Sequence, residues 1–267
     1  MAHVAAPDAG PGRWAWLLAS FTRREILNRY AGSVSGLAWT LLHPLAQLAI
    51  FAWVFSNVFR VAVPEGYPGT SYVAFVAVAL WPWIMFSEGL NRAMGSVGAN
   101  AGLIKKVAFP HRLVVYASVL ACCAVHAVGF LAVLIALKAH GEPIRLSGLP
   151  IALVLMVPYM LLAAGLGAFL AALQTLLRDV EHVVQVLITI LFYASPILYP
   201  ASLLPAEVQG YVKANPLAWF SERLREVLLQ GAGFVATDAL VAAGCLAVFF
   251  AGLWVFNRLS PSFEDFL

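Results

Sequence analysis

The sequence is poor in charge. Only 11% of its 267 residues are Asp, Glu, Lys or Arg, and 62% are hydrophobic, whereas a soluble domain carries about 25% charged residues. Too little polar surface remains to cover a soluble core, so the sequence predicts an integral membrane protein. The net charge of +3 forms no basic stripe with interleaved aromatic residues, which argues against nucleic acid as a partner.

Lysine is scarcer still, and its few positions exclude a phosphate-binding loop. The four lysines are Lys105, Lys106, Lys138 and Lys213, and none is followed by Ser or Thr. The motif G-x-x-x-x-G-K-[ST] is therefore absent, which excludes ATP hydrolysis by that route. The H-E-x-x-H motif is also absent, and residues 32–36, GSVSG, hold valine where a nucleophile elbow needs serine. We expect no catalytic residues and no cofactor in this chain.

Cysteine is equally rare and has no metal-ligand spacing. Cys122, Cys123 and Cys245 all lie in apolar runs. Neighbouring cysteines on a helix face different directions, so they do not form a tetrahedral site. We interpret all three as small buried hydrophobes and expect no bound metal.

Ionisable residues are nearly missing from the apolar runs. His43 and His126 are the main exceptions, and Glu88 lies near the end of one run. Carboxylates and lysines inside membrane segments mark many ion-coupled sites, so their scarcity argues against a secondary transporter. It also argues against an intramembrane enzyme, which needs paired acid and base groups. Our interpretation of both histidines is structural: His43 precedes Pro44 and would bond a carbonyl freed by that proline.

What is abundant is apolar sequence long enough to cross a bilayer, which takes about 20 residues. Six such stretches occur, and the second contains Pro82, where a bend is expected. The six predicted spans are residues 36–59, 71–90, 113–137, 149–173, 183–199 and 239–256.

The distribution of Lys and Arg predicts that both termini are cytoplasmic. The other side of the predicted spans carries Arg60, Lys138, Arg145, Lys213, Arg223 and Arg225, the last three in one long segment where the rule is weak. The side of the termini carries Arg13, Arg23, Arg24, Arg29, Arg92, Lys105, Lys106, Arg112, Arg178 and Arg258.

The outer connection after residue 199 is too apolar for an ordinary loop. Pro205 and Pro216 stand where two short helices would begin. We expect these helices to dip into the outer interface or to lie along it, with an ordinary loop as the alternative. Backbone at membrane depth must be covered by protein or line a cavity, so dipping helices would imply a pore or a gate.

The fourth predicted span carries a face of small residues. Ala164, Ala168 and Ala172 recur every four residues, with Gly165 and Gly167 beside them. Small residues allow close helix packing in lipid. Packing within the chain and dimerisation are equally compatible with this pattern.

The segment before the first span combines charge with helix-forming residues. Residues 1–12 read as a flexible tail, and residues 13–30 as a helix that carries Arg23, Arg24 and Arg29. The apolar residues of this helix fall on two nearly opposite sides. Its first half is therefore expected to lie on the inner interface and its second half to turn toward the span. A simple positive-inside anchor is the alternative.

Two motifs connect the chain with a known family. One is N-x-x-L-I-K-K-x-x-F-P at residues 100–110. The other, R-x-I-x-x-R-Y-x-x-S-x-x-G-x-x-W, is formed by Arg24, Ile26, Arg29, Tyr30, Ser33, Gly36 and Trp39. With the later stretches YASPILYP and NPLAWF, the chain resembles the membrane subunit of ATP-driven polysaccharide exporters, in the type-2 class of ABC permeases.

The resemblance implies an all-α membrane fold in a single domain, residues 13–267. It comprises six spans, an N-terminal interface helix, a cytoplasmic coupling helix at about residues 95–109, and two short outer helices between residues 200 and 230. It also implies a homodimer that pairs with two copies of a separate ATPase subunit, which binds ATP and Mg. The residues expected to contact that ATPase are Arg23, Arg24, Arg29, Lys105, Lys106, Phe109 and Pro110.

The resemblance also implies a glycan channel and an outer gate. The candidate channel residues are Tyr72, Trp81, Trp83, Phe86 and Tyr193, and a lipid-facing or interfacial position is the alternative for each ring. The candidate gate residues are Pro196, Tyr199, Pro200, Pro216, Trp219 and Phe220.

The function implied is export of a lipid-linked polysaccharide across the bacterial inner membrane. O-antigen is the favoured cargo, and capsule or teichoic acid is the alternative within the same class. A type-2 permease for a lipid or a drug is the alternative outside it.

Overall fold

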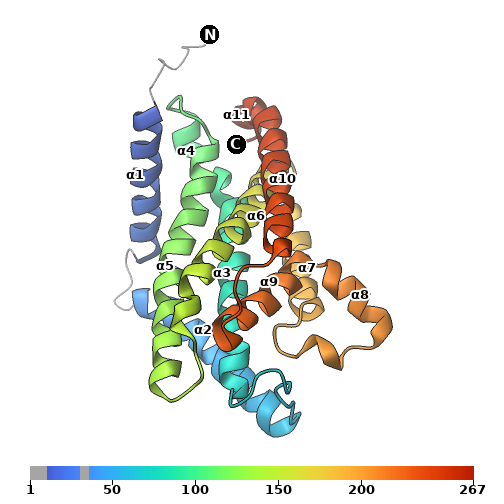
Figure 1. Ribbon diagram of the computed structural model, residues 1–267. Helices are drawn as coiled ribbons and strands as arrows, with labels where there is room; N and C mark the ends of the chain where they lie inside the picture. The colour runs from blue at the N-terminus through green and yellow to red at the C-terminus, as the bar shows by residue number, and fades with distance from the viewer. Residues whose placement is uncertain (1–10, 31–35) are drawn as a thin grey trace.

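The computed structural model describes residues 11–30 and 36–267, and its regular elements in these ranges are all helical (Figure 1). Five helices are long and apolar enough to cross a membrane. They are α2 (Gly36–Trp53, continued by a π-helical turn at Val54–Val58), α3 (Tyr72–Ala99), α5 (Arg112–Ala139), α6 (Leu149–Leu176) and α10 (Ala236–Leu259). A shorter apolar helix, α7 (Val180–Ala194), is the sixth. The predicted all-α membrane fold is confirmed.

The fifth predicted span, residues 183–199, is helical only as far as residue 194, and its last five residues are not. Helix α7 ends at Ala194, and residues 195–200 are not helical. Pro196 disfavours the helical conformation at Ser195, which is extended, with ψ 140°. The 15 residues of α7 span only about 22 Å, less than the ~30 Å hydrocarbon thickness. The chain therefore completes this passage without a helix.

Helix α3 is the centre of the bundle. Most of its residues are buried, and it packs against α5, α6 and α9 (Pro216–Arg225). It runs through Pro82 without interruption and continues nine residues beyond the predicted end at residue 90. Glu88 therefore lies inside a helix and not at its end.

The small residues of α6 are used for packing within the chain. A Cβ atom at Gly252 of α10 would lie 2.0 Å from the carbonyl oxygen of Gly165, and one at Gly167 would lie 2.4 Å from Cβ of Ala93 on α3. Only glycine allows such close backbone approach. These contacts favour the intrachain alternative over dimerisation for this face.

The two short helices predicted between residues 200 and 230 are present. They are α8 (Ala206–Ala214) and α9, and the side chain of Asn215 caps α9 by accepting a hydrogen bond from the Leu217 amide at 3.0 Å. Helix α9 is largely buried against α3 and α6, whereas α8 is mostly exposed and projects from the side of the bundle (Figure 1). The alternative of an ordinary loop is wrong.

At the opposite end, α1 (Pro11–Tyr30) is one continuous helix that lies beside α5 (Figure 1). The expected turn in its middle is absent. Trp14, Leu17 and Phe21 pack on the cluster of buried residues between α5, α6 and α10. Of the predicted tail, residues 1–10 lie outside the described residues, as does Ser33 of the sequence motif. Pro11 and Gly12 already belong to α1.

The predicted coupling helix at residues 95–109 is not a single helix. Residues 95–99 are the end of α3, and α4 (Ala101–Ile104) follows as one short turn. Asn100 separates them, with φ −110°. Its side chain donates to the Ser96 carbonyl at 2.8 Å and accepts from the Arg24 guanidinium. A side chain that competes for backbone hydrogen bonds in this way ends a helix.

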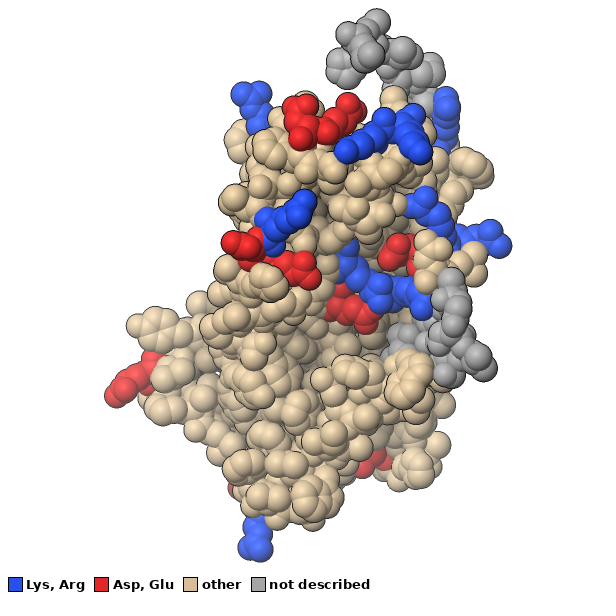
Figure 2. All heavy atoms as spheres, turned by 180° about the vertical axis from the view of Figure 1, so that it is seen from behind, with Lys and Arg blue, Asp and Glu red and all other residues tan. Residues whose placement is uncertain are grey.

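Short elements complete the chain. A C-terminal turn, α11 (Phe263–Phe266), places Phe263 against Phe256 of α10, with ring centroids 5.3 Å apart. Further turns lie at Leu146–Gly148, Ala201–Leu203, Glu226–Gln230 and Ser260–Ser262. Figure 2 shows that Lys and Arg gather over the upper half of one face, whereas most of the lower half is uncharged.

Candidate functional site

A groove of about 430 Å³ lies between α2, α3 and α7. One part of its wall is aromatic, and the rest is rich in side chains that donate or accept hydrogen bonds. The aromatic residues are Phe51, Trp83, Phe192 and Tyr193, and the polar residues are His43, Gln47, Ser87, Glu88, Asn91 and Thr189. A surface of this kind binds a ligand that has both hydroxyl groups and apolar C–H faces.

The aromatic wall is continuous across the three helices. Phe192 of α7 lies at its centre, with ring centroids 5.8 Å from Phe51, 5.7 Å from Trp83 and 5.1 Å from Tyr193. Tyr193 is 60% exposed. Trp83 and Tyr193, two of the five predicted channel residues, therefore line one groove.

The other three predicted channel residues lie in the core. Tyr72 is buried and donates to the carbonyl of Leu198, and Trp81 donates from Nε1 to the carbonyl of His126 at 3.0 Å. Phe86 is buried against Tyr159, with ring centroids 5.0 Å apart. All three side chains are therefore engaged inside the chain and are not available to line a channel.

A cluster of ion pairs adjoins this groove and was missed by the sequence analysis. Glu88 contacts Arg92 Nε at 2.6 Å, Arg29 Nη1 at 3.4 Å and His126 Nε2 at 2.7 Å. Arg92 also faces Glu25 at 3.8 Å. The cluster joins α1, α3 and α5 at the depth of the spans. Only the i, i+4 spacing of Glu88 and Arg92 was visible in the sequence.

This cluster changes the interpretation of Arg29 and identifies the partner of His126. The Arg29 side chain is 3% exposed and faces Glu88, so it offers no surface to another subunit, and we remove it from the expected ATPase contact. His126 has a structural role, as predicted, and its partner is the carboxylate of Glu88. Donor atoms of Glu88, Cys122 and His126 lie within 4.8 Å of one another, but the two guanidinium groups at Glu88 oppose a cation there.

At the end of the bundle where α9 lies, Arg225 supports the non-helical backbone that follows α7. Its guanidinium is fully buried and donates to the carbonyls of Pro196 at 2.7 Å, Ile197 at 2.6 Å and Phe75 at 3.0 Å. It also contacts Glu222 at 3.1 Å. Burial is the main reason that the pKa of Glu222 is raised. Non-helical backbone at membrane depth requires cover by protein, and Arg225 provides it.

Arg223, two residues before Arg225, is likewise not a free charge. It is 3% exposed and contacts Asp238 at 2.7 Å and Glu226 at 2.8 Å. Both arginines therefore serve packing within the chain, and they do not count as flanking charges in the topology argument.

The six predicted gate residues do not gather at one opening. Pro196 and Pro200 are buried, and Tyr199 donates from its hydroxyl to the Tyr193 carbonyl at 2.6 Å. Phe220 is in the core against Tyr159, with ring centroids 4.5 Å apart. Pro216 and Trp219 instead border a different cavity of about 270 Å³ toward α6 and α10.

The remaining candidates for the ATPase contact divide into exposed and buried residues. Arg23, Lys105 and Lys106 are exposed, Arg24 is exposed but bonded to Asn100, and Pro110 is half-buried.

Phe109 is buried and packs edge-on against Phe21 of α1, with ring centroids 5.4 Å apart. Val107, beside the two lysines, is 49% exposed. The exposed apolar residue of this corner is therefore Val107 and not Phe109.

Long apolar helices around a groove with polar and aromatic walls define a multi-pass membrane protein of the permease type. The chain belongs to the ABC-2 type transporter family, whose family model matches residues 17–229.

Three relatives illustrate the similarity. A Klebsiella pneumoniae protein named O-antigen export system permease protein RfbA is 29% identical over 256 residues, 94% of this chain and 95% of that protein. A Myxococcus xanthus protein of the same name is 28% identical over 72% of this chain and 71% of its own length. The polysialic acid transport protein KpsM of Escherichia coli is 26% identical over 78% of this chain and 79% of its own length.

Proposed function

We propose that this chain is the transmembrane subunit of an ATP-driven exporter that moves a lipid-linked polysaccharide outward across the bacterial inner membrane. The observation that carries the proposal is the groove between α2, α3 and α7, where aromatic rings and polar side chains share one wall. Sugar rings present hydroxyl groups and C–H faces, and this wall complements both. The names of the relatives support a polysaccharide and favour O-antigen over capsule or teichoic acid as the cargo.

We also propose a homodimer that works with two copies of a separate ATPase subunit, which would bind ATP and Mg. Beside the groove, α7 exposes Ile190 and Tyr193, and α2 exposes Ile50 and Trp53. A second copy seated on this apolar face would close the groove into a channel. The absence of a phosphate-binding loop in this chain supports a separate ATPase.

The proposed orientation places both termini in the cytoplasm. The end of the bundle that holds α4, α11 and the start of α1 carries the exposed Arg23, Lys105, Lys106 and Arg258. Burial of Arg223 and Arg225 in ion pairs lowers the number of free cations at the other end. Both observations favour the positive-inside orientation.

The groove assignment predicts that aromatic truncation impairs export. Tyr193→Ala is expected to reduce surface polysaccharide several-fold, because it removes the ring of this wall that is 60% exposed and open to a sugar. The measurement is complementation of a deletion strain, with cell-surface polysaccharide and permease level determined in parallel. Trp254→Ala on α10, where the ring is 70% exposed and outside the groove, is the matched control. Full export by Tyr193→Ala at normal protein level would contradict the assignment.

The exposed residues that follow α4 predict that coupling to the ATPase can be impaired without loss of the folded chain. Lys105→Ala, Lys106→Ala and Val107→Ser together are expected to leave the membrane level unchanged but to reduce co-purification of the ATPase and export. Exposed residues contribute little to folding, whereas charges and an apolar side chain desolvated at an interface contribute to binding.

Phe109→Ala is the comparison for this coupling prediction. Its ring packs inside the chain on Phe21, so its loss is expected to lower protein stability. Intact co-purification and export in the triple variant would rule out the coupling role. Loss of the triple variant from the membrane would show that the lysines act in topology alone.

A further inference from the structure

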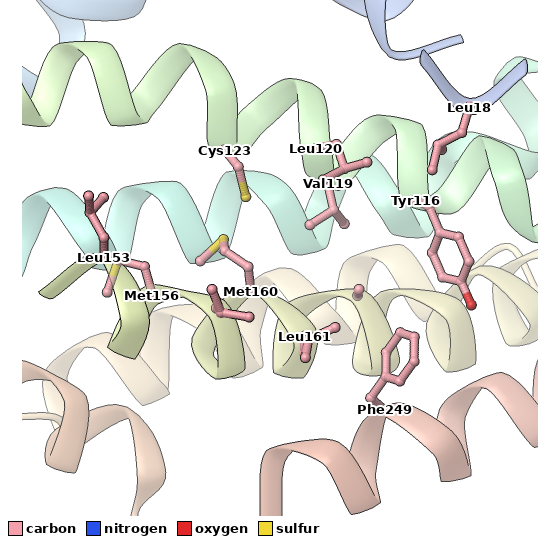
Figure 3. Close-up of a pocket in the computed structure, with 12 residues that line it drawn as sticks. Leu18, Tyr116, Val119, Leu120, Cys123, Leu153, Met156, Met160, Leu161 and Phe249 are labelled. Carbon is pink, nitrogen blue, oxygen red and sulfur yellow. The ribbon is translucent and has the colours of Figure 1, made fainter. Parts of the chain in front are cut away.

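A second groove, of about 440 Å³, lies between α1, α5, α6 and α10, none of which borders the first groove (Figure 3). Its walls are apolar along nearly their whole extent. Leu18 closes it from α1, Leu120 and Cys123 from α5, and Met156 and Met160 from α6. Methionine side chains adapt to irregular apolar ligands.

The groove runs along the helices and therefore across the membrane. On α6 it extends from Leu153 to Ala164, a rise of about 16 Å at 1.5 Å per residue. Both α5 and α6 are long enough to cross a membrane. Leu153 is 60% and Val157 59% exposed, so the α6 wall faces outward at the depth of the hydrocarbon.

One end of this otherwise apolar groove is marked by the hydroxyl of Tyr116. Figure 3 shows the Tyr116 hydroxyl at the end near Leu18, above Phe249, whose ring centroid lies 5.9 Å from that of Tyr116. Arg112 stands four residues before Tyr116, on the same face of α5, and is exposed. Among the described residues, no carboxylate lies within salt-bridge distance of Arg112.

An apolar trough at hydrocarbon depth, with a hydroxyl at one end and an exposed cation one helical turn beyond its lining residues, complements an amphiphile that has an apolar chain and an anionic head. We propose that this groove binds one acyl chain of an anionic bilayer phospholipid, whose phosphate is held by the Arg112 guanidinium and the Tyr116 hydroxyl. Cations at the membrane surface attract anionic lipids, and guanidinium groups bind phosphate well. Because Leu18 belongs to α1, the bound chain stabilises the packing of α1 on α5.

The test counts lipid bound to the full-length chain in detergent by native mass spectrometry. The probes are phosphatidylglycerol and phosphatidylcholine with identical acyl chains, at equal concentration. The native chain is expected to retain phosphatidylglycerol preferentially. Arg112→Gln is expected to reduce that preference on the order of fivefold, as for one surface cation. Leu120→Trp, which fills the groove, is expected to reduce retention of both lipids.

Two controls match these variants. Arg258→Gln removes an exposed cation outside the groove, and Val128→Trp adds the same ring at a 70% exposed position of α5 outside it. Neither is expected to change retention. Should Leu120→Trp not be monodisperse, Leu153→Trp replaces it. Equal retention of the two lipids by the native chain, or an undiminished preference in Arg112→Gln, would refute the proposal. If Leu120→Trp changes the oligomeric state without loss of bound lipid, the lipid proposal is refuted. The occupant of the groove would then be a second copy of this chain.

Discussion

Replacement of Arg225 by leucine is expected to prevent accumulation of the folded chain in the membrane. The substitution leaves the carbonyls of Phe75, Pro196 and Ile197 without the donors that they have now. It also leaves the half-buried Glu222 carboxylate without its cation. Each lost partner costs about 1–3 kcal/mol, so the sum is comparable to the whole stability of a typical protein, about 5–15 kcal/mol.

Membrane abundance and the monodisperse fraction after detergent extraction measure this effect. Arg258→Leu is the matched control, because Arg258 is exposed in the last turn of α10. Arg225→Lys is expected to be intermediate, since a single ammonium group cannot reproduce a planar fork that reaches several carbonyls. Normal accumulation of Arg225→Leu would show that the backbone after α7 is stable without this guanidinium.

Replacement of Glu88 by glutamine is expected to produce the second largest effect. Glu88 is the carboxylate that Arg29, Arg92 and His126 share. Its loss leaves the Arg29 guanidinium buried without a counter-charge, and breaking a buried pair in this way costs about 3–5 kcal/mol. Because the cluster holds α1 to α3 and α5, we expect lower thermal stability of the purified chain and a loosened α1.

A double-mutant cycle separates this ion pair from general damage. Arg29→Gln with Glu88→Gln replaces both charges by amides, so the double variant is expected to be more stable than the sum of the two single effects predicts. A coupling of about 1–3 kcal/mol is typical of residues in one ionic network. Glu264→Gln, at an exposed position, is the control. Strictly additive effects would show that Arg29 and Glu88 do not interact.

Much of the candidate site could be anticipated only as a list of residue types. The family resemblance implied a channel lined by aromatic residues, and Trp83 and Tyr193 do line a groove. Tyr72, Trp81 and Phe86 have the same chemistry in sequence, but the rotation of α3 directs them into the core. The polar part of the groove, from His43 to Thr189, comes from three helices, and no local spacing connects residues so far apart.

The sequence by itself determined that the chain lies in lipid and that its elements are helices. A chain with 62% hydrophobic and 11% charged residues must place its surface in lipid, and lipid demands backbone hydrogen bonds within each segment, hence helices. The prolines at 205 and 216 likewise marked the two outer helices, because proline favours the start of a helix.

Only the tertiary structure decided which charges pair and which faces meet. Arg29 reaches Glu88 from another helix, and Arg225 reaches carbonyls of α3 and of the segment after α7. Gly165 and Gly252 meet because two helices cross there. The hydrophobic periodicity of one helix shows which of its faces is apolar. It does not show which neighbouring helix covers that face. A charged residue that the sequence alone would place on the surface can therefore be buried, because a distant helix supplies its counter-charge.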